Sequence, residues 1–256
     1  MKILQGTTRF WSTIGWMAES PGLESKEFSV THRRRRGQLP GGRHGLPREV
    51  VAESQRERIL KAMTIAAGRG GFRDAHVTEV VNRAGVSRRT FYEHFKGKDE
   101  CFAAAYARSM EQLWQLTLRD FEVEDDWVDG LRAGLKAMLE ALARRPEVAS
   151  VCFVEVLAAG PLAGQQRDEA MRKFLPLFES APTGVPRTMR IFEALCLGRV
   201  ADLGAVLHRE IAGERVAELP ELLPELTYMM VLPFLGPEAA ARELERPATD
   251  TKEAAA

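Results

Sequence analysis

Long hydrophobic runs are missing from this sequence. The most apolar stretch, residues 148–159, contains Glu155 and is shorter than the roughly 18 uninterrupted apolar residues that a membrane-spanning helix needs. Residues 1–17 begin with a basic residue, but Ser12, Thr13 and Gly15 interrupt their apolar character and no small-residue cleavage site follows. We therefore expect neither an integral membrane protein nor a signal peptide.

Cysteine is scarce as well. Cys101, Cys152 and Cys196 lie far apart, each inside a stretch with helical periodicity, and this spacing fits neither a disulfide framework nor a zinc site. We expect inert thiols in a reducing compartment, which places the protein in the cytoplasm.

Catalytic motifs are also absent. The sequence contains no nucleophile elbow, phosphate-binding loop or dinucleotide fingerprint, and its five histidines show no metal-binding spacing. We therefore expect no enzymatic activity, no cofactor and no metal.

The last absence concerns strand signals. The sequence has no alternating β-branched runs and no hairpin dipeptides, whereas apolar residues recur at the helical period with Gly and Pro between segments. These features predict an all-α protein. The expected helices cover residues 48–69, 77–84, 87–94, 98–118, 127–142, 148–159, 162–180 with a break near Pro176, 188–212 and 219–235.

The charge is zero overall but unevenly distributed. Residues 31–100 carry 16 Lys and Arg against 8 Asp and Glu, and residues 101–256 carry 17 against 25. A basic front on an acidic rear indicates a polyanion-binding head attached to a body with another task.

Residues 1–47, rich in Gly, Pro, Ser and Arg, are expected to form a disordered basic arm. Its run Arg33 to Arg36 leaves three interpretations open: a solubilising tail, an arm that touches DNA, or non-native sequence upstream of a misassigned start.

The most informative stretch is VTEVVNRAGVSRRTFYEHF, residues 77–95. Two short helices joined by a tight turn form a helix-turn-helix pattern, in which Gly85 supplies the left-handed turn residue and Ser87 caps the second helix. Phe91 and Phe95 share its buried side. The solvent face then carries donors suited to phosphates and guanine edges, namely Arg88, Arg89, Thr90, Tyr92 and His94.

The stretch AGVSRRTFYEHFKGKDECF, with the amphipathic helix 53–67 before it, resembles the DNA-binding domain of the TetR family of bacterial transcriptional regulators. The resemblance covers about residues 54–102. It implies a homodimer that binds double-stranded DNA at a palindromic operator, with repression as the family default, and a C-terminal domain that binds a small-molecule effector and thereby releases the DNA.

The resemblance also implies roles for individual residues. Phosphate-contacting positions fall on Tyr92, His94 and Lys98, base-reading positions fall on Arg88, Arg89 and Thr90, and Ser87 completes the expected contact set. Two positions depart from the pattern: His76 replaces the usual threonine cap and Gly97 replaces the usual polar residue before the lysine.

Four segments follow from this organisation. We expect the arm at 1–47, the helix-turn-helix domain at 48–98, a helical effector-binding and dimerisation domain at 99–245, and a disordered tail at 246–256. Ala194, Gly198, Ala201 and Ala205 recur about once per turn, so the helix that carries them can approach another closely and, with the last helix, form a dimer seam.

Glu155 is the residue of the rear half that most needs explanation, because the surrounding stretch is apolar and a buried carboxylate requires partners. It either forms a structural pair or domain-surface contact, or faces a polar or cationic effector. Apolar residues nearby belong to the core or to the walls of such a pocket. The candidate effector-binding residues are Cys152, Phe153, Glu155, Met171, Phe174, Phe178, Met189 and Phe192.

A second function stays open at this stage. A helix-turn-helix protein that has lost its effector response would bind DNA constitutively and would carry the same motif.

Overall fold

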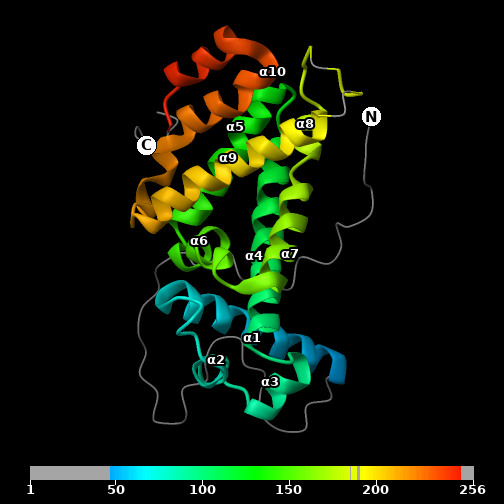
Figure 1. Ribbon diagram of the computed structural model, residues 1–256, viewed down its shortest axis with the longest axis vertical. Coiled ribbons are helices and arrows are strands. Elements are labelled where there is room, and N and C mark those ends of the chain that lie inside the picture. The colour runs from blue at the N-terminus through cyan, green and yellow to red at the C-terminus, as the bar shows by residue number, and fades with distance from the viewer. Residues whose placement is uncertain (1–46, 185, 189–190, 249–256) are drawn as a thin grey trace, which may run out of the picture. The chain divides into compact units, whose positions relative to one another are not determined.

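The computed structural model describes residues 47–184, 186–188 and 191–248, so the predicted arm and most of the predicted tail lie outside the described residues. Regular structure within these ranges is entirely helical, as predicted (Figure 1). The α-helices are α1 (Arg48–Gly70), α2 (Val77–Ala84), α3 (Arg88–His94), α4 (Lys98–Phe121), α5 (Trp127–Ala143), α6 (Pro146–Phe153), α7 (Gly160–Lys173), α8 (Pro176–Glu179), α9 (Phe192–Ala212) and α10 (Leu223–Glu245), and the 3₁₀ helices are η1 (Glu155–Leu157) and η2 (Val216–Leu222).

The predicted helix 148–159 was wrong in its second half. α6 ends at Phe153 because the backbone leaves helical geometry at Val154, and the chain continues as the 3₁₀ turn η1. Gly160 then takes a left-handed conformation with φ +82°, which turns the chain directly into α7. The apolar stretch therefore makes a bend rather than one long helix.

The predicted break near Pro176 is confirmed, because α7 ends at Lys173 and Pro176 starts the separate helix α8, where its missing N–H costs nothing. Other boundaries differ from the prediction, since α9 begins at Phe192 rather than at residue 188. The last predicted helix begins as η2 and extends to Glu245, with a break at Gly236, whose φ is +81°.

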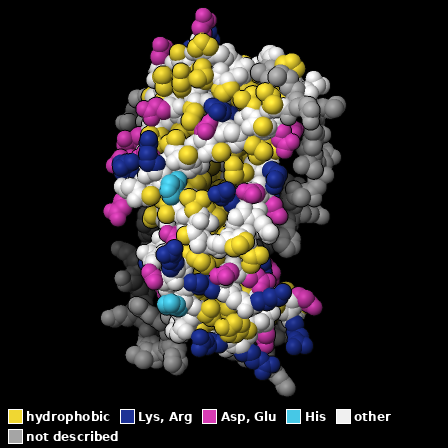
Figure 2. Space-filling view, in the orientation of Figure 1, with side chains coloured by type: hydrophobic (Ala, Val, Ile, Leu, Met, Phe, Trp, Pro, Cys, Tyr) yellow, Lys and Arg dark blue, Asp and Glu magenta, His cyan; other side chains and the backbone are white. Residues whose placement is uncertain are grey.

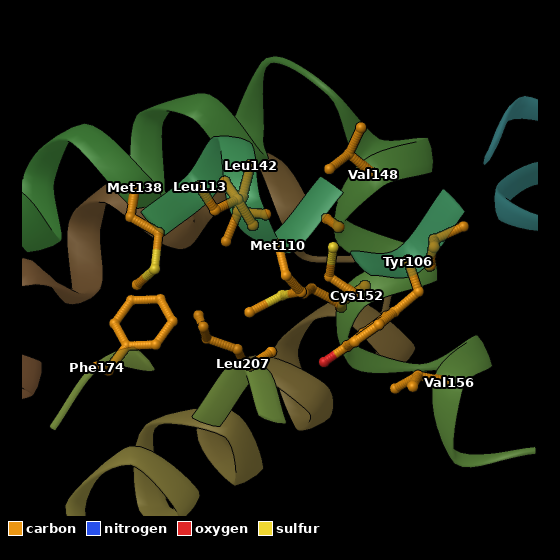
Figure 3. Packing of buried hydrophobic residues seen from close by; sticks show 14 of the residues in the cluster. Tyr106, Met110, Leu113, Met138, Leu142, Val148, Cys152, Val156, Phe174 and Leu207 are labelled. Carbon is orange, nitrogen blue, oxygen red and sulfur yellow. The ribbon is translucent and has the colours of Figure 1, made fainter. Parts of the chain in front are cut away.

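Helix α4 is the central element of the described part. It packs against α1 at its beginning and against α5 and α7 along its length (Figure 1). Its buried aromatic residues, Phe102 and Tyr106, join one continuous apolar core, and Figure 3 shows Tyr106 among its neighbours in that core. At the far end of the bundle, the Trp127 ring packs edge-on against Phe234, and its Nε1 donates to the carbonyl of Leu177 over 2.7 Å.

No single helix in the described ranges is long and apolar enough to cross a membrane. One pair, Pro146–Leu157 with Gly160–Glu179, reaches the required length and composition only when taken together, and it is bent by 116°.

The end of α1 lies against the start of α6 with no side chain between the two backbones. A methyl group added at Gly68 would lie 2.4 Å from the carbonyl oxygen of Glu147. Beside this contact, the Nε and Nη2 atoms of Arg69 donate to the Glu147 carboxylate over 2.9 and 2.6 Å. The close approach of these two backbones fixes where α1 sits on the rest of the bundle.

We predict that Gly68→Ala destabilises the protein by about 1–3 kcal/mol, because its methyl group would force α1 away from α6. Gly70→Ala is the matched control, since nothing lies within 4 Å of a methyl group there and alanine is the better helix former. Urea unfolding of the full chain measures both. Equal stability of the two variants would contradict the backbone contact.

Candidate DNA-binding and effector sites

The helix-turn-helix has the local geometry that its sequence predicts. Gly85 ends α2 in the left-handed conformation, with φ 63° and ψ 43°. Ser87 caps α3 by accepting a hydrogen bond from the Thr90 amide over 3.0 Å. His76 makes no capping bond to α2. Phe91 is fully buried and Phe95 nearly so, which anchors α3 against the core.

Arg58 supports the turn from α1, a role that the sequence analysis missed. Its Nη1 donates to the carbonyls of Ala84 and Gly85 over 2.8 and 3.3 Å. These two carbonyls lie at the end of α2, where a helix has no internal partners left for them. The guanidinium group thereby holds α1 and the turn together.

Most of the predicted DNA-contacting side chains reach solvent on α3. Arg88 is exposed, the Tyr92 residue is 55% exposed, and the Arg89 side chain is 90% exposed although its Nε contacts Glu93. Ser87 is also exposed, whereas Thr90 and His94 are half-buried. Figure 2 shows several Lys and Arg side chains at the end formed by α2 and α3.

Lys98 has a partner within the protein. Its Nζ donates to the carbonyls of Phe72 and Arg73 over 3.0 and 3.1 Å and lies 4.4 Å from the centroid of the Phe72 ring. The ammonium group thus joins the start of α4 to the loop after α1. This leaves it half-buried beside the surface that α3 presents.

The body contains a cavity of about 410 Å³, a size within the usual range for small-molecule sites. Figure 2 shows the face of the molecule hollowed near α9, with hydrophobic side chains around the hollow. The walls come from α4 to α10. Residues that line them include Met110, Leu131, Leu135, Met138, Val156, Leu157, Leu177, Val200, Leu203 and Met230.

Most of the predicted effector-binding residues lie on these walls. They are Cys152, Phe153, Met171, Phe174 and Phe178. Phe192 is buried but does not line the cavity, because it begins α9 while the lining part of that helix starts at Val200. Met189 lies outside the described residues.

Of the two alternatives for Glu155, the structure supports a contact within the protein, because Glu155 is not among the cavity's lining residues as its place in the candidate effector-binding set required. The break after α6 turns its carboxylate toward α1, where Oε2 accepts a hydrogen bond from the Phe72 amide over 2.6 Å. The partner that a half-buried acid requires is thus a backbone N–H in the loop after α1.

Four lining residues that were not predicted from the sequence carry polar groups. They are Tyr106, Thr117, Arg167 and His208. The Thr117 hydroxyl donates to its own helix, at the Leu113 carbonyl. His208 Nδ1 lies 2.8 Å from the Phe153 carbonyl oxygen, and since that oxygen only accepts, Nδ1 carries the proton. Burial raises the pKa of the Tyr106 phenol and of the Cys152 thiol, which keeps both neutral.

No three His, Cys, Asp or Glu side chains in the described ranges are placed to hold a metal ion.

Comparisons with known proteins agree with this geometry. Residues 59–105 match the family model for bacterial regulatory proteins of the tetR family. The chain is 26% identical over 114 residues to the HTH-type transcriptional activator FasR of Mycolicibacterium smegmatis, a match that covers 44% of this chain and spans about half, 52%, of that relative's length.

Two solved structures share the fold. The fatty acid degradation regulator FadR of Bacillus halodurans superposes with a TM-score of 0.59 at 16% identity, and the transcriptional regulator FadR of Bacillus subtilis in complex with stearoyl-CoA superposes with 0.57 at 17%. Each match covers 69% of this chain and 96% of the other. The helix-turn-helix and the family model together identify residues 59–105 as a DNA-binding domain of the kind found in bacterial regulatory proteins of the tetR family, and the two solved structures show that the described chain shares the fold of such regulators.

Proposed function

We propose that this protein is a homodimeric repressor that binds a palindromic operator and is released from it by a small-molecule effector. The observation that carries the proposal is the pairing of two features in one bundle. The helix-turn-helix presents Arg88, Arg89 and Tyr92 to solvent. The helices that follow it, α4 to α10, enclose a largely apolar cavity.

The proposed DNA contacts come from the exposed face of α3 and from residues at or near its two ends. Arg88 and Arg89 are suited to the acceptor pair of guanine, and the Tyr92 hydroxyl is suited to a phosphate. Ser87, Thr90, His94 and Lys98 complete this set, Lys98 with an ammonium group that it shares with two carbonyls.

Helix α9 supports the proposed dimer. Ala194, Ala201 and Ala205 are exposed on it, and Ile191 just before it is 62% exposed. Small side chains let a second helix approach closely, and exposed apolar residues favour burial against a partner. A second copy of α9 and α10 meets both requirements and is two-fold symmetric, as a palindrome demands.

The walls of the cavity favour an effector with a hydrocarbon part. Each methylene group that such a ligand buries there contributes about 0.8 kcal/mol. The solved structure of FadR of Bacillus subtilis holds stearoyl-CoA, and the flexible side chains of Met110, Met138 and Met171 give this cavity walls that adapt to a chain.

The segment α6–η1 connects the proposed effector to the DNA-binding helices. Cys152, Phe153 and Val156 face the cavity. Glu147 and Glu155 from the same segment bond to the end of α1 and to the loop that follows it. An effector that displaces this segment changes the position of α1, and α4 offers a second connection because it packs on both parts.

In vitro selection of randomised duplex DNA by the full-length protein tests the function. We expect an inverted repeat with half-sites about one helical turn, roughly 34–36 Å, apart or a multiple of it. Light scattering should give twice the chain mass of 28.5 kDa. A stable monomer at micromolar concentration, or selection without sequence preference, would overturn the proposal. A reporter with the selected site upstream of its promoter then separates repression from the activation that the FasR name denotes.

We predict that Arg88→Ala and Arg89→Ala change the sequence preference of DNA binding, whereas Tyr92→Phe changes only the overall affinity for DNA. If an arginine reads a guanine, its loss costs about 1–3 kcal/mol on the selected site and relaxes the preference at one position. Loss of the Tyr92 hydroxyl should weaken all sequences alike. Binding titrations on selected and scrambled DNA measure this, with the exposed Arg172→Ala on α7 as control. Uniform losses for all three variants would contradict base reading.

We predict that Glu155→Ala lowers the free energy of unfolding by about 1.5–3 kcal/mol, because it leaves the Phe72 amide without its charged acceptor. Glu155→Gln keeps an acceptor and should cost less. Glu147→Gln is the control, since its partner side chain, Arg69, is 66% exposed and such pairs contribute at most about 1 kcal/mol. Urea unfolding that ranks Glu147→Gln as the most damaging variant would refute this assignment.

A further inference from the structure

The cavity holds two polar groups without a hydrogen-bond partner among the described residues. Tyr106 is 1% exposed and lines the cavity, yet no residue of the described part hydrogen-bonds to its hydroxyl. Figure 3 shows this oxygen pointing toward the middle of the packed side chains. The Nε of Arg167 is likewise buried and without a hydrogen-bond partner. A buried donor with no partner costs stability unless a ligand supplies the acceptor.

The charge of the cavity has one sign. Arg167 is the charged residue among the described lining residues, which include no Asp or Glu. Its Nη2 lies 3.5 Å from Asp168, a neighbour whose side chain is 57% exposed, so this ion pair is weak and lies on the solvent side. Arg167 therefore supplies a positive charge to the lining of the cavity, with its Nε buried in the protein.

The two groups line the same cavity. Burial is the main cause of the raised pKa of the Tyr106 phenol, and the positive charge of Arg167 acts on it in the opposite direction. Both residues lie on helices that pack along each other, α4 and α7. A phenolic O–H and a guanidinium N–H that converge on one region are the donors that a carboxylate or phosphate oxygen accepts from.

We propose that Tyr106 and Arg167 form the head-group end of the effector cavity and select an amphiphile with an anionic head over neutral or cationic ones. The inference rests on the proposed function, because it assigns the chemistry of the effector that the cavity takes. It differs from the second alternative that the sequence left open for Glu155, which was a polar or cationic effector.

The shared requirement is an anionic oxygen at the end of an apolar chain. Two sources of that chemistry are a fatty acid, which ends in its carboxylate, and an acyl-coenzyme A, whose phosphates lie beyond its thioester. In both cases the hydrocarbon chain lies against the apolar walls, and an anionic oxygen accepts a hydrogen bond from the Arg167 guanidinium.

Calorimetric titration of the full-length, lipid-stripped protein tests this with dodecanoate, dodecanol, dodecylamine and dodecanoyl-coenzyme A. The chains are equal, so differences report the head group. Dodecanoate should bind about tenfold to a hundredfold more tightly than dodecanol, which is the factor expected for a hydrogen bond to a charged group. Dodecylamine should bind most weakly. Tighter binding of dodecanoate than of the thioester assigns a free carboxylate, and the reverse order assigns the phosphates.

Two variants locate the effect. Tyr106→Phe removes one oxygen, and Arg167→Gln removes the charge at a half-exposed position where folding is not at risk. Each should reduce the affinity for the anionic probes to that for dodecanol and leave dodecanol binding unchanged, while Arg172→Gln on the same helix changes nothing.

Equal binding of dodecanoate and dodecanol, or equal losses for all probes in Arg167→Gln, would overturn the head-group assignment while the cavity stands as an amphiphile site. Absence of binding by all four probes would overturn both this inference and the effector part of the proposed function. Sequence-selective DNA binding is measured without any probe, so its failure is recognised separately.

Discussion

The backbone contact between Gly68 and Glu147 is the constraint on which the rest of the structure depends. Only a residue without a side chain lets α1 reach the start of α6 at this distance. Once the two backbones meet, Arg69 reaches Glu147 and the Phe72 amide reaches Glu155. The helix-turn-helix is therefore fastened to the segment that lines the cavity. Because close-packed elements shift as units rather than deform continuously, a contact of this kind transmits displacement.

The cavity sets a second constraint that opposes the first. Walls that face one another across a cavity of about 410 Å³ forgo dispersion contacts with one another, and the buried Nε of Arg167 has no hydrogen-bond partner among the described residues. A bundle of this size carries that cost because the remainder of its core is dense around α4 and α5. A ligand that fills the cavity provides the dispersion contacts, and its acceptor oxygen provides the hydrogen bond. Binding to the folded state alone then stabilises it by mass action.

The helix-turn-helix could be predicted from sequence because its signals are local. Gly85, Ser87 and Phe91 each act within a few residues of their own position, and each adopts the expected conformation or burial. The roles of Arg58 and Lys98 could not be found this way. Their partners lie more than twenty residues away in the sequence, and only the packing of α1 against α2 and against α4 brings them together.

The walls of the cavity were partly predictable for the same reason. Apolar periodicity identified Met171, Phe174 and Phe178, whose helices face inward. It misplaced Glu155, because the helical period assumed for 148–159 fails at Val154, and one broken turn redirects every side chain that follows. The polar lining residues Arg167 and His208 carry no periodic signal, since an isolated polar residue on a helix resembles a solvated one.

The connection between the two sites is anchored on both sides of α6. His208 on α9 holds the Phe153 carbonyl at its end, while Glu147 near its start is bonded to α1. An effector can favour one position of α6 over another only if it contacts both α6 and a second helix, so that a shift of α6 changes those contacts. The cavity meets this condition, because its lining includes Cys152 and Phe153 from α6, Tyr106 from α4 and Arg167 from α7. A ligand that spans them fixes the distance between α6 and α4, and both of these helices contact α1. In the proposed function, occupancy of the cavity sets the position of the DNA-binding helices through these contacts, without any contact between effector and DNA-binding residues.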